Sequence, residues 1–244
     1  MQQTGLLAQK KIALAVGKSA IGNVLQKHLL SLGASILFLG DISEGDSSDN
    51  LLNIQCDLTD IENLEEVLKP VINEFKPIDG FVFAGGIGGV RPLSLTKPVF
   101  MTEMMRANLL SFVELCRLLT KKGVMSSGGS IVALSSVSST QGLKSKIAYS
   151  ASKAALDGAM RSMAAELADK KIRVNSIQKG WVTSDMQLDF IQNNRSLSGE
   201  DDFNKQLLGA IDPEEIAHTV AFLLSDATKT ITGTSIVLDG GYTL

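Results

Sequence analysis

The sequence has few of the residues that would point to a secreted, metal-binding or nucleic-acid-binding protein. Only two of its 244 residues are cysteines, Cys56 and Cys116, and they show no metal-ligand spacing. This usage suits a reducing, cytoplasmic setting. There are only two histidines, His28 on an apolar helix face and His218 in a later helical pattern, so we expect no metal site. The net charge of −3 gives no reason to expect a nucleic-acid partner.

Long apolar stretches are also absent. No run approaches the roughly eighteen residues that a bilayer-spanning helix needs, so we expect no membrane partner. The segment from Met1 to Lys11 lacks the basic start and apolar stretch of a signal peptide. Without repeats or low-complexity tracts, a chain of this length predicts a single domain spanning residues 1–244.

Short apolar runs alternate with helical patterns along the whole chain. Strands are expected at Lys11–Val16, Ser35–Leu39, Leu51–Gln55, Gly80–Ala84, Ser130–Leu134, Arg173–Gln178 and Ser235–Leu238. Helical spacing covers Ile21–Leu32, Asp60–Phe75, Met101–Lys121, Tyr149–Lys170 and Pro213–Leu224. Nearly continuous apolar strands separated by helices indicate a parallel sheet that is covered on both faces. We therefore predict an α/β fold of the doubly wound, Rossmann type, with a mostly parallel, seven-stranded sheet.

The turn from the first strand into the first helix has the composition of a phosphate-binding loop. It runs from Gly17 to Gly22, with Ser19 and Ile21 at the start of the helix. Glycine lets the backbone approach a pyrophosphate, and the helix N-terminus offers unpaired N–H groups. The turn predicts dinucleotide binding, although glycines at such a turn can also be purely structural.

An acidic residue follows the second expected strand. Asp41 lies 19 positions after Gly22 (41 − 22), close to the spacing of about 20 typical of an acid that binds the ribose hydroxyls of NAD. A carboxylate there would repel a 2′-phosphate, so NAD(H) is favoured. NADP(H) remains possible because Lys18 can offset that repulsion. The alternative is a solvated loop acid.

The helical pattern near residue 150 carries a phenol and an ammonium on one face. Tyr149 and Lys153 are four residues apart, which is about one helical turn. A phenol titrates near 10, and a neighbouring ammonium stabilises the phenolate. The pair therefore predicts a general acid/base with a lowered pKa. An exposed helix pair is the other interpretation.

These features occur in the order found in one enzyme family. Ser135 and Ser136 end the fifth expected strand, Asn108 lies in the helix before it, and Ser136 precedes Tyr149 by thirteen positions (149 − 136). Further matches are Asp57 in Cys56–Thr59, the Ala84-Gly85 turn, Arg173–Asn175, Thr232-Gly233 and Leu238–Gly241. Over nearly its whole length the chain resembles the short-chain dehydrogenase/reductase family, particularly its 3-oxoacyl-reductase-like members.

The resemblance implies a catalytic set of four residues. Tyr149 would exchange the proton while Ser136 hydrogen-bonds the oxygen of a carbonyl or secondary-alcohol substrate. Lys153 would also hold the nicotinamide ribose, and Asn108 would anchor a water that links Lys153 to solvent. The coenzyme would supply the hydride.

The resemblance also implies coenzyme contacts along the strand ends. Asp57 and Leu58 are expected beside the adenine, and Ala84 and Gly85 beside the adenosine ribose. Gly180, Val182 and Ser184 are expected on the nicotinamide side, together with Tyr149 and Lys153. Asp57 can equally be a capping or loop acid.

Several features of the sequence depart from the family pattern. The glycine turn is one residue shorter than usual and has Ala20 in place of its middle glycine, which predicts altered pyrophosphate contacts. Phe83 replaces an asparagine that braces neighbouring strands, and Lys179 replaces the proline beside the nicotinamide. These changes leave open a second hypothesis, a non-catalytic dinucleotide-binding or scaffolding protein.

The substrate side is less defined. A substrate lid is expected at about residues 183–209, where apolar side chains can cover a substrate or pack onto the domain. Arg91, Lys144 and Lys146 flank strand ends, where they can attract an acidic or phosphopantetheine-bearing substrate or be solvated surface charges. Trp181 is expected beside the nicotinamide or in the core. Small residues along the Tyr149 helix permit close packing between subunits, and the resemblance implies a dimer or tetramer.

Overall fold

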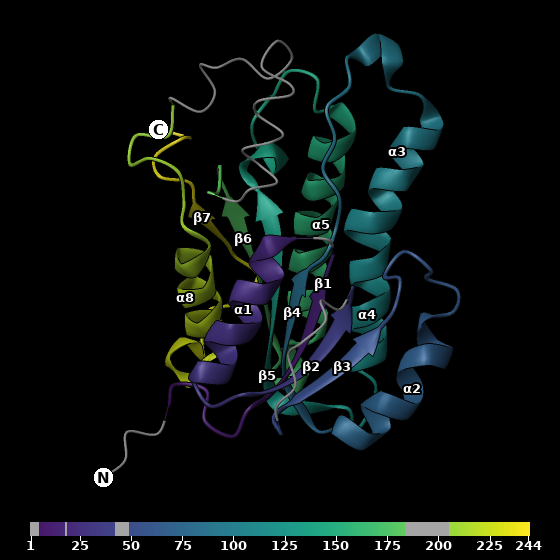
Figure 1. Ribbon diagram of the computed structural model, residues 1–244, viewed down its shortest axis with the longest axis vertical. Coiled ribbons are helices and arrows are strands. Elements are labelled where there is room, and N and C mark those ends of the chain that lie inside the picture. The colour runs from purple at the N-terminus through teal and green to yellow at the C-terminus, as the bar shows by residue number, and fades with distance from the viewer. Residues whose placement is uncertain (1–4, 18, 42–48, 184–204) are drawn as a thin grey trace.

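Seven strands form one sheet in which every neighbouring pair is parallel. The computed structural model describes residues 5–17, 19–41, 49–183 and 205–244. The strands are β1 (Lys11–Val16), β2 (Ser35–Gly40), β3 (Leu51–Gln55), β4 (Ile78–Ala84), β5 (Met125–Ser136), β6 (Arg173–Lys179) and β7 (Ser235–Leu238). They lie in the order β3-β2-β1-β4-β5-β6-β7, as Figure 1 shows. The predicted doubly wound, seven-stranded sheet is confirmed.

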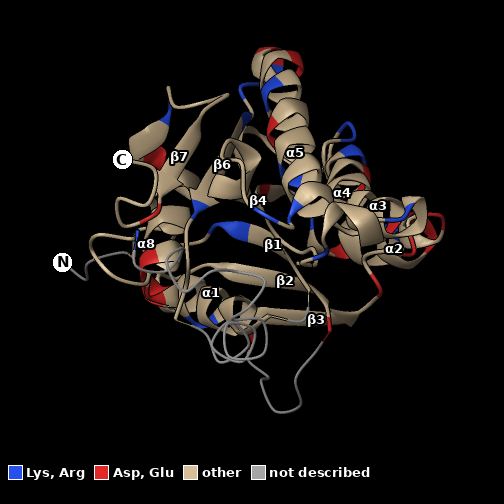
Figure 2. Cartoon of the chain, turned by 90° about the horizontal axis from the view of Figure 1, so that it is seen from above, with Lys and Arg blue, Asp and Glu red and all other residues tan. Residues whose placement is uncertain are grey.

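Helices cover both faces of this sheet because its strands are apolar on both sides. One face packs against α2 (Leu64–Phe75), α4 (Ser111–Leu119) and α5 (Ile147–Glu166). The other face packs against α1 (Ala20–Ser31) and α8 (Pro213–Leu224). Figure 2 shows these two groups on opposite sides of the sheet. No helix in the described part of the chain is long and apolar enough to cross a bilayer.

One expected helix is divided into three parts. In place of a continuous helix over Met101–Lys121, the chain forms α3 (Pro98–Met105), the π-helical turn η2 (Arg106–Leu110) and then α4. Such π turns are often found at functional sites. Asn108 lies within this turn, and its side chain is fully buried. Short 3₁₀ helices occur at Leu93–Leu95, Val137–Ser139, Ala168–Lys170 and Asp226–Thr228.

The strand registers bring several loops to one edge of the sheet. Val16 at the end of β1 is level with Gly40 on β2 and Ala84 on β4, and Ser136 on β5 is level with Lys179 on β6. In a doubly wound sheet, ligands bind outside these carboxyl ends. The topology therefore gathers the predicted site residues along this edge.

Candidate active site

A pocket of about 810 Å³ lies along the carboxyl ends of the strands. This volume is within the usual range for small-molecule and cofactor sites. It is lined by most of the residues expected from the sequence: Gly17, Ser19, Ile21, Asp41, Asp57, Leu58, Ala84, Gly85, Ser136, Tyr149, Lys153 and Gly180. Gly22, Asn108 and Val182 do not line it. Ser184 lies outside the described residues, as does most of the expected lid at 183–209.

The described residues of the glycine turn lie on the wall of this pocket. β1 ends at Val16 and Ser19 is already the N-cap of α1, with its hydroxyl accepting from the Ile21 N–H at 3.3 Å. Ser19 and Ile21 both line the pocket, so the positive end of α1 faces it. A Cβ at Gly22 would come within 2.1 Å of a Val16 side-chain carbon. Gly22 therefore serves the close packing of helix on strand.

Two aspartates mark the end of the pocket that lies over β2 and β3. Asp41 accepts a hydrogen bond from the Gln55 side chain at 3.0 Å, and both residues line the pocket. Asp57 accepts from the backbone N–H and the hydroxyl of Thr59 at 2.8 and 2.7 Å. Asp57 thus stabilises its own loop while lining the pocket, so the two interpretations of this residue are compatible.

Phe83 belongs to the core. Its ring is fully buried, and its centroid lies 5.3 Å from that of Phe112 and 6.5 Å from that of Phe81. Aromatic packing therefore holds the end of β4 where the family pattern has a polar brace. The substitution replaces polar contacts behind the pocket with aromatic packing, and the Ala84-Gly85 turn still lines the pocket.

Asn108 connects the loop after β4 to α5. Its side chain accepts from the Ile87 N–H at 2.7 Å and donates to the Ile87 carbonyl at 3.0 Å. It also donates to the Ser152 hydroxyl at 2.8 Å. Ser152 immediately precedes Lys153, so Asn108 positions both the pocket wall at Gly86-Ile87 and the helix that carries the lysine. The proposed water link stays a prediction.

Ser136, Tyr149 and Lys153 meet at the other end of the pocket. Ser136 is hydrogen-bonded to Tyr149, and this bond lowers the tyrosine pKa. Burial raises that pKa by more, so the net shift is upward. Lys153 donates to the Leu134 carbonyl at 2.9 Å, and its nitrogen is 6.0 Å from the Tyr149 ring centre. The prediction of a net lowered tyrosine pKa is wrong, because desolvation outweighs stabilisation of the phenolate.

Comparisons with known proteins identify the family to which this chain belongs. Residues 17–243 match the family described as enoyl-(acyl carrier protein) reductase. The 3-oxoacyl-[acyl-carrier-protein] reductase of Mus musculus is 32% identical over 232 residues, covering 94% of each chain. The fold superposes on a short chain dehydrogenase family protein from Francisella tularensis with a TM-score of 0.83 at 28% identity, covering 97% of this chain and 99% of that one.

The chain is a short-chain dehydrogenase/reductase. Its family consists of NAD(P)-dependent oxidoreductases that act on carbonyl and alcohol substrates. A short chain dehydrogenase from Leptospira borgpetersenii with bound NAD⁺ superposes with a TM-score of 0.84 at 26% identity, covering 98% of this chain and 94% of that one. The resemblance identified from the sequence is confirmed.

The pocket of this short-chain dehydrogenase/reductase has further lining residues, of which Tyr242 was not predicted from the sequence. Lys146, Lys179, Trp181 and Tyr242 all line it. The Lys146 ammonium lies 4.5 Å from the Trp181 ring centre, which places Trp181 at the site and not in the core. Burial lowers the pKa of Lys153 to about 7, with a further contribution from Lys179. Burial also lowers the pKa of Lys179 to about 8, and Lys146 adds to this shift.

The described end of the expected lid is fixed beside Trp181. Gln206 is buried, and its amide accepts from the Trp181 N–H at 2.9 Å and donates to the Trp181 carbonyl at 3.0 Å. Val182 forms a parallel bridge with Ile211, and Thr183 donates to the Ile211 carbonyl at 2.8 Å. The chain therefore enters and leaves residues 184–204 at one anchored point next to the pocket.

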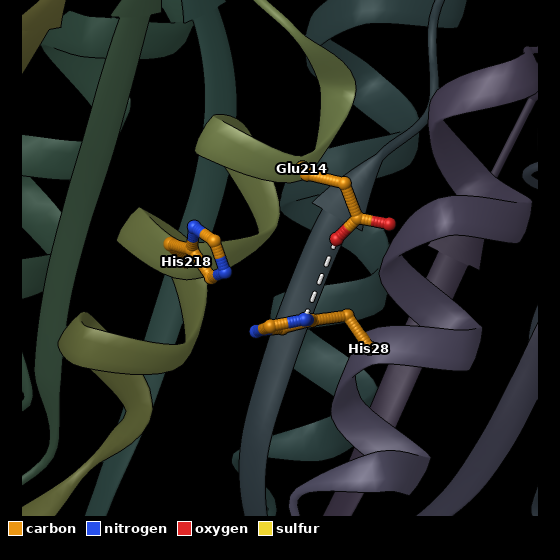
Figure 3. Close-up of side chains that lie close together, drawn as sticks. All are labelled: His28, Glu214 and His218. Atoms are coloured by element: carbon orange, nitrogen blue, oxygen red, sulfur yellow. Dashed lines mark ion pairs between the residues drawn. The ribbon is translucent and has the colours of Figure 1, made fainter.

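A second titratable cluster lies between α1 and α8, away from the pocket lining (Figure 3). His28 on α1 pairs with Glu214 on α8 at 3.5 Å, and its ring meets that of His218 edge-on at a centroid distance of 4.7 Å. The three groups bring ligand atoms within 4.8 Å of one another, so they could hold a divalent metal. The sequence did not indicate this cluster, because the residues lie on helices at opposite ends of the chain. Burial, followed by His218, lowers the His28 pKa.

Proposed function

We propose that the chain is a reductase that transfers hydride from a nicotinamide dinucleotide, preferably NADH, to the carbonyl of a small or medium-sized substrate. The observation that carries this proposal is one continuous pocket with Ser136, Tyr149 and Lys153 at one end and Asp41 at the other. A dinucleotide whose adenosine ribose lies at Asp41 must extend along the whole pocket for its nicotinamide to lie beside the Tyr149 phenol. Gly17 and the α1 N-terminus on the pocket wall fit its pyrophosphate.

Each catalytic residue has a distinct role in this proposal. The coenzyme supplies the hydride when it is bound. Ser136 hydrogen-bonds the substrate oxygen, and Tyr149 gives that oxygen its proton. Lys153 holds the nicotinamide ribose from α5, where the Leu134 carbonyl fixes its ammonium at 2.9 Å. Asn108 positions α5 through Ser152.

The raised pKa of Tyr149 leaves its phenol in the form that can donate a proton. Burial keeps the phenol protonated, so it can donate a proton to a developing alkoxide without first acquiring one. Oxidation of an alcohol needs the phenolate, whose population at pH 7 is small when the pKa is raised. We therefore infer that Tyr149 acts as the proton donor when a carbonyl is reduced.

The coenzyme preference rests on Asp41. Its carboxylate lines the pocket end over β2, and Gln55 holds it at 3.0 Å. A carboxylate in that position accepts bonds from ribose hydroxyls and repels a 2′-phosphate. NAD(H) is therefore the proposed coenzyme and NADP(H) the weaker alternative.

Replacing Asp41 by asparagine is expected to raise kcat/KM with NADPH relative to NADH by about tenfold or more, since about 1.4 kcal/mol of removed repulsion corresponds to a factor of ten. Steady-state rates with both coenzymes measure this ratio. Asp57→Asn is the matched control, because it removes the same charge from an aspartate that is turned to Thr59. An unchanged ratio in Asp41→Asn, or an equal change in the control, would contradict the assignment.

Turnover on a panel of ketones, aldehydes and secondary alcohols, run with NADH and NADPH, tests the enzymatic function. We expect saturable NADH binding, followed by nicotinamide fluorescence, and reduction of at least one carbonyl class. Binding without turnover across the panel would support the scaffolding alternative. Absence of binding to either coenzyme would reject both hypotheses.

We also propose a homo-oligomer, a dimer or tetramer, in a reducing, cytoplasmic compartment. The outer face of α5 carries the exposed small residues Ala151 and Ala154, and the apolar Ile147 beside them is 40% exposed. Such a surface suits close helix packing between subunits. Cys56 and Cys116 are free thiols, as expected in a reducing setting. Light scattering that returned a monomer would reject the assembly.

A further inference from the structure

The charges that line the pocket are separated by sign. Its described acidic residues are Asp41 and Asp57, which follow β2 and β3 at one side of the sheet. Its described cations are Lys146, Lys153 and Lys179, and they surround Ser136 and Tyr149 over β5 and β6. A substrate carbonyl at Ser136 and Tyr149 would therefore lie among ammonium groups, with no carboxylate among the described lining residues at that end.

Lys179 lies next to the serine that would bind the substrate oxygen. Ser136 and Lys179 are register partners on neighbouring parallel strands. Side chains level with one another on adjacent strands point to the same face of a sheet, so the lysine side chain lies alongside the serine hydroxyl. Both residues line the pocket. Strand register thus places a cation one strand away from the reacting group.

The Lys179 ammonium has no protein counter-ion within the described part of the chain. It makes no ion pair or hydrogen bond there, whereas Lys153 donates to the Leu134 carbonyl and Lys146 lies over Trp181. The buried carboxylate of Asp157 does not line the pocket. It accepts hydrogen bonds from the side chains of Ser176 and Gln178, both at 2.8 Å. A half-buried cation beside two other cations is costly unless an anion joins it.

We propose that this end of the pocket binds a substrate that carries a carboxylate near its carbonyl, with Lys179 as the residue that holds the carboxylate and Lys146 as a secondary cation. The inference rests on the proposed function and names its substrate class, a short oxo acid. Lys179 is a specificity-determining residue here, because it binds the part of the substrate that does not react. The proline expected from the family pattern has no donor for this purpose.

The pH dependence of binding follows from the groups around Lys179. These are Lys146 before α5, Tyr149 and Lys153 on α5, and Asp157 behind them. The pKa of Lys179 is lowered to about 8, so its ammonium is mostly present at pH 7 and is lost as the pH rises through that value. We expect carboxylate affinity to fall between pH 7 and 9, while affinity for an uncharged analogue stays level.

The test compares oxo acids of four to six carbons, with the oxo group at carbon 2, 3 or 4, with their methyl esters. For the native enzyme we expect kcat/KM at least tenfold higher for one acid than for its ester. Lys179→Met should raise KM for that acid by 10- to 100-fold, with a smaller change in kcat and little change for the ester. Lys144→Met is the control, since Lys144 is exposed and does not line the pocket.

Binding measured without turnover keeps this inference separate from the proposed function. Calorimetric titration of the full chain with the same acids and esters, alone and with NAD⁺ present, should show acid binding that Lys179→Met removes. Acid binding without turnover would support the anion site while rejecting the reductase. Equal affinity for acid and ester would overturn the anion site, and so would a Lys179→Met variant that weakened only coenzyme binding.

Discussion

Tyr149→Phe is expected to lower kcat for carbonyl reduction by about 10³-fold, within the range usual for loss of a general acid. The substitution removes only the hydroxyl that would donate the proton, while the ring keeps its place on α5. Ser136 would still bind the substrate oxygen, so KM should change far less than kcat. The hydroxyl is hydrogen-bonded to Ser136.

Rates of NADH oxidation with the best substrate of the panel measure this effect. NADH binding, followed by fluorescence, is the internal control and should stay within about twofold of the native value, which separates a chemical defect from a binding defect. A Tyr149→Phe enzyme with full turnover would remove the basis for the proposed mechanism. Loss of NADH binding in the variant would instead assign the phenol a coenzyme-holding role.

Asn108→Ala is expected to lower the free energy of unfolding by about 3 kcal/mol. The substitution leaves the Ile87 N–H and carbonyl without their side-chain partner, and it removes the bond to the Ser152 hydroxyl. Each buried polar group left unsatisfied costs about 1–3 kcal/mol. Asn108 is fully buried, so water does not readily replace the amide.

Denaturant unfolding of the native chain and the variant measures this loss. Ser111→Ala is a matched control three residues along the same helical segment, because Ser111 is also fully buried but its hydroxyl only donates to the Ala107 carbonyl at 2.7 Å. We expect the control to cost less than about 1 kcal/mol. Equal effects of the two substitutions would show that burial of the helix, and not the bonds to Ile87, sets the stability here.

The central strands were predictable because each is a nearly continuous apolar run, and these runs are buried in the sheet. β1, β3 and β7 have the predicted bounds, and the other four extend beyond them. The extensions at the ends of β5 and β6 include Ser136 and Lys179, which are polar because they lie where the sheet meets the pocket. Hydrophobic periodicity does not detect such residues.

The division of the helix at Asn108 was not predictable from local sequence. Helical spacing continues from Met101 to Lys121, and the π turn coincides with side-chain bonds to Ile87, 21 residues earlier. Likewise, the sequence indicated that Lys179 departs from the family pattern but not that it lies beside Ser136. That fact depends on the pairing register of β5 and β6, which is a property of the folded sheet.

The segments Trp181–Thr183 and Gln206–Ile211 are bonded to each other, and this pairing has an evolutionary consequence. Because Gln206 and Ile211 bond directly to Trp181 and Thr183, the described chain on either side of residues 184–204 is held together at the end of β6. Descendants of this protein could thus vary the chain beyond these fixed points while inheriting the proton donor and its supporting helix unchanged.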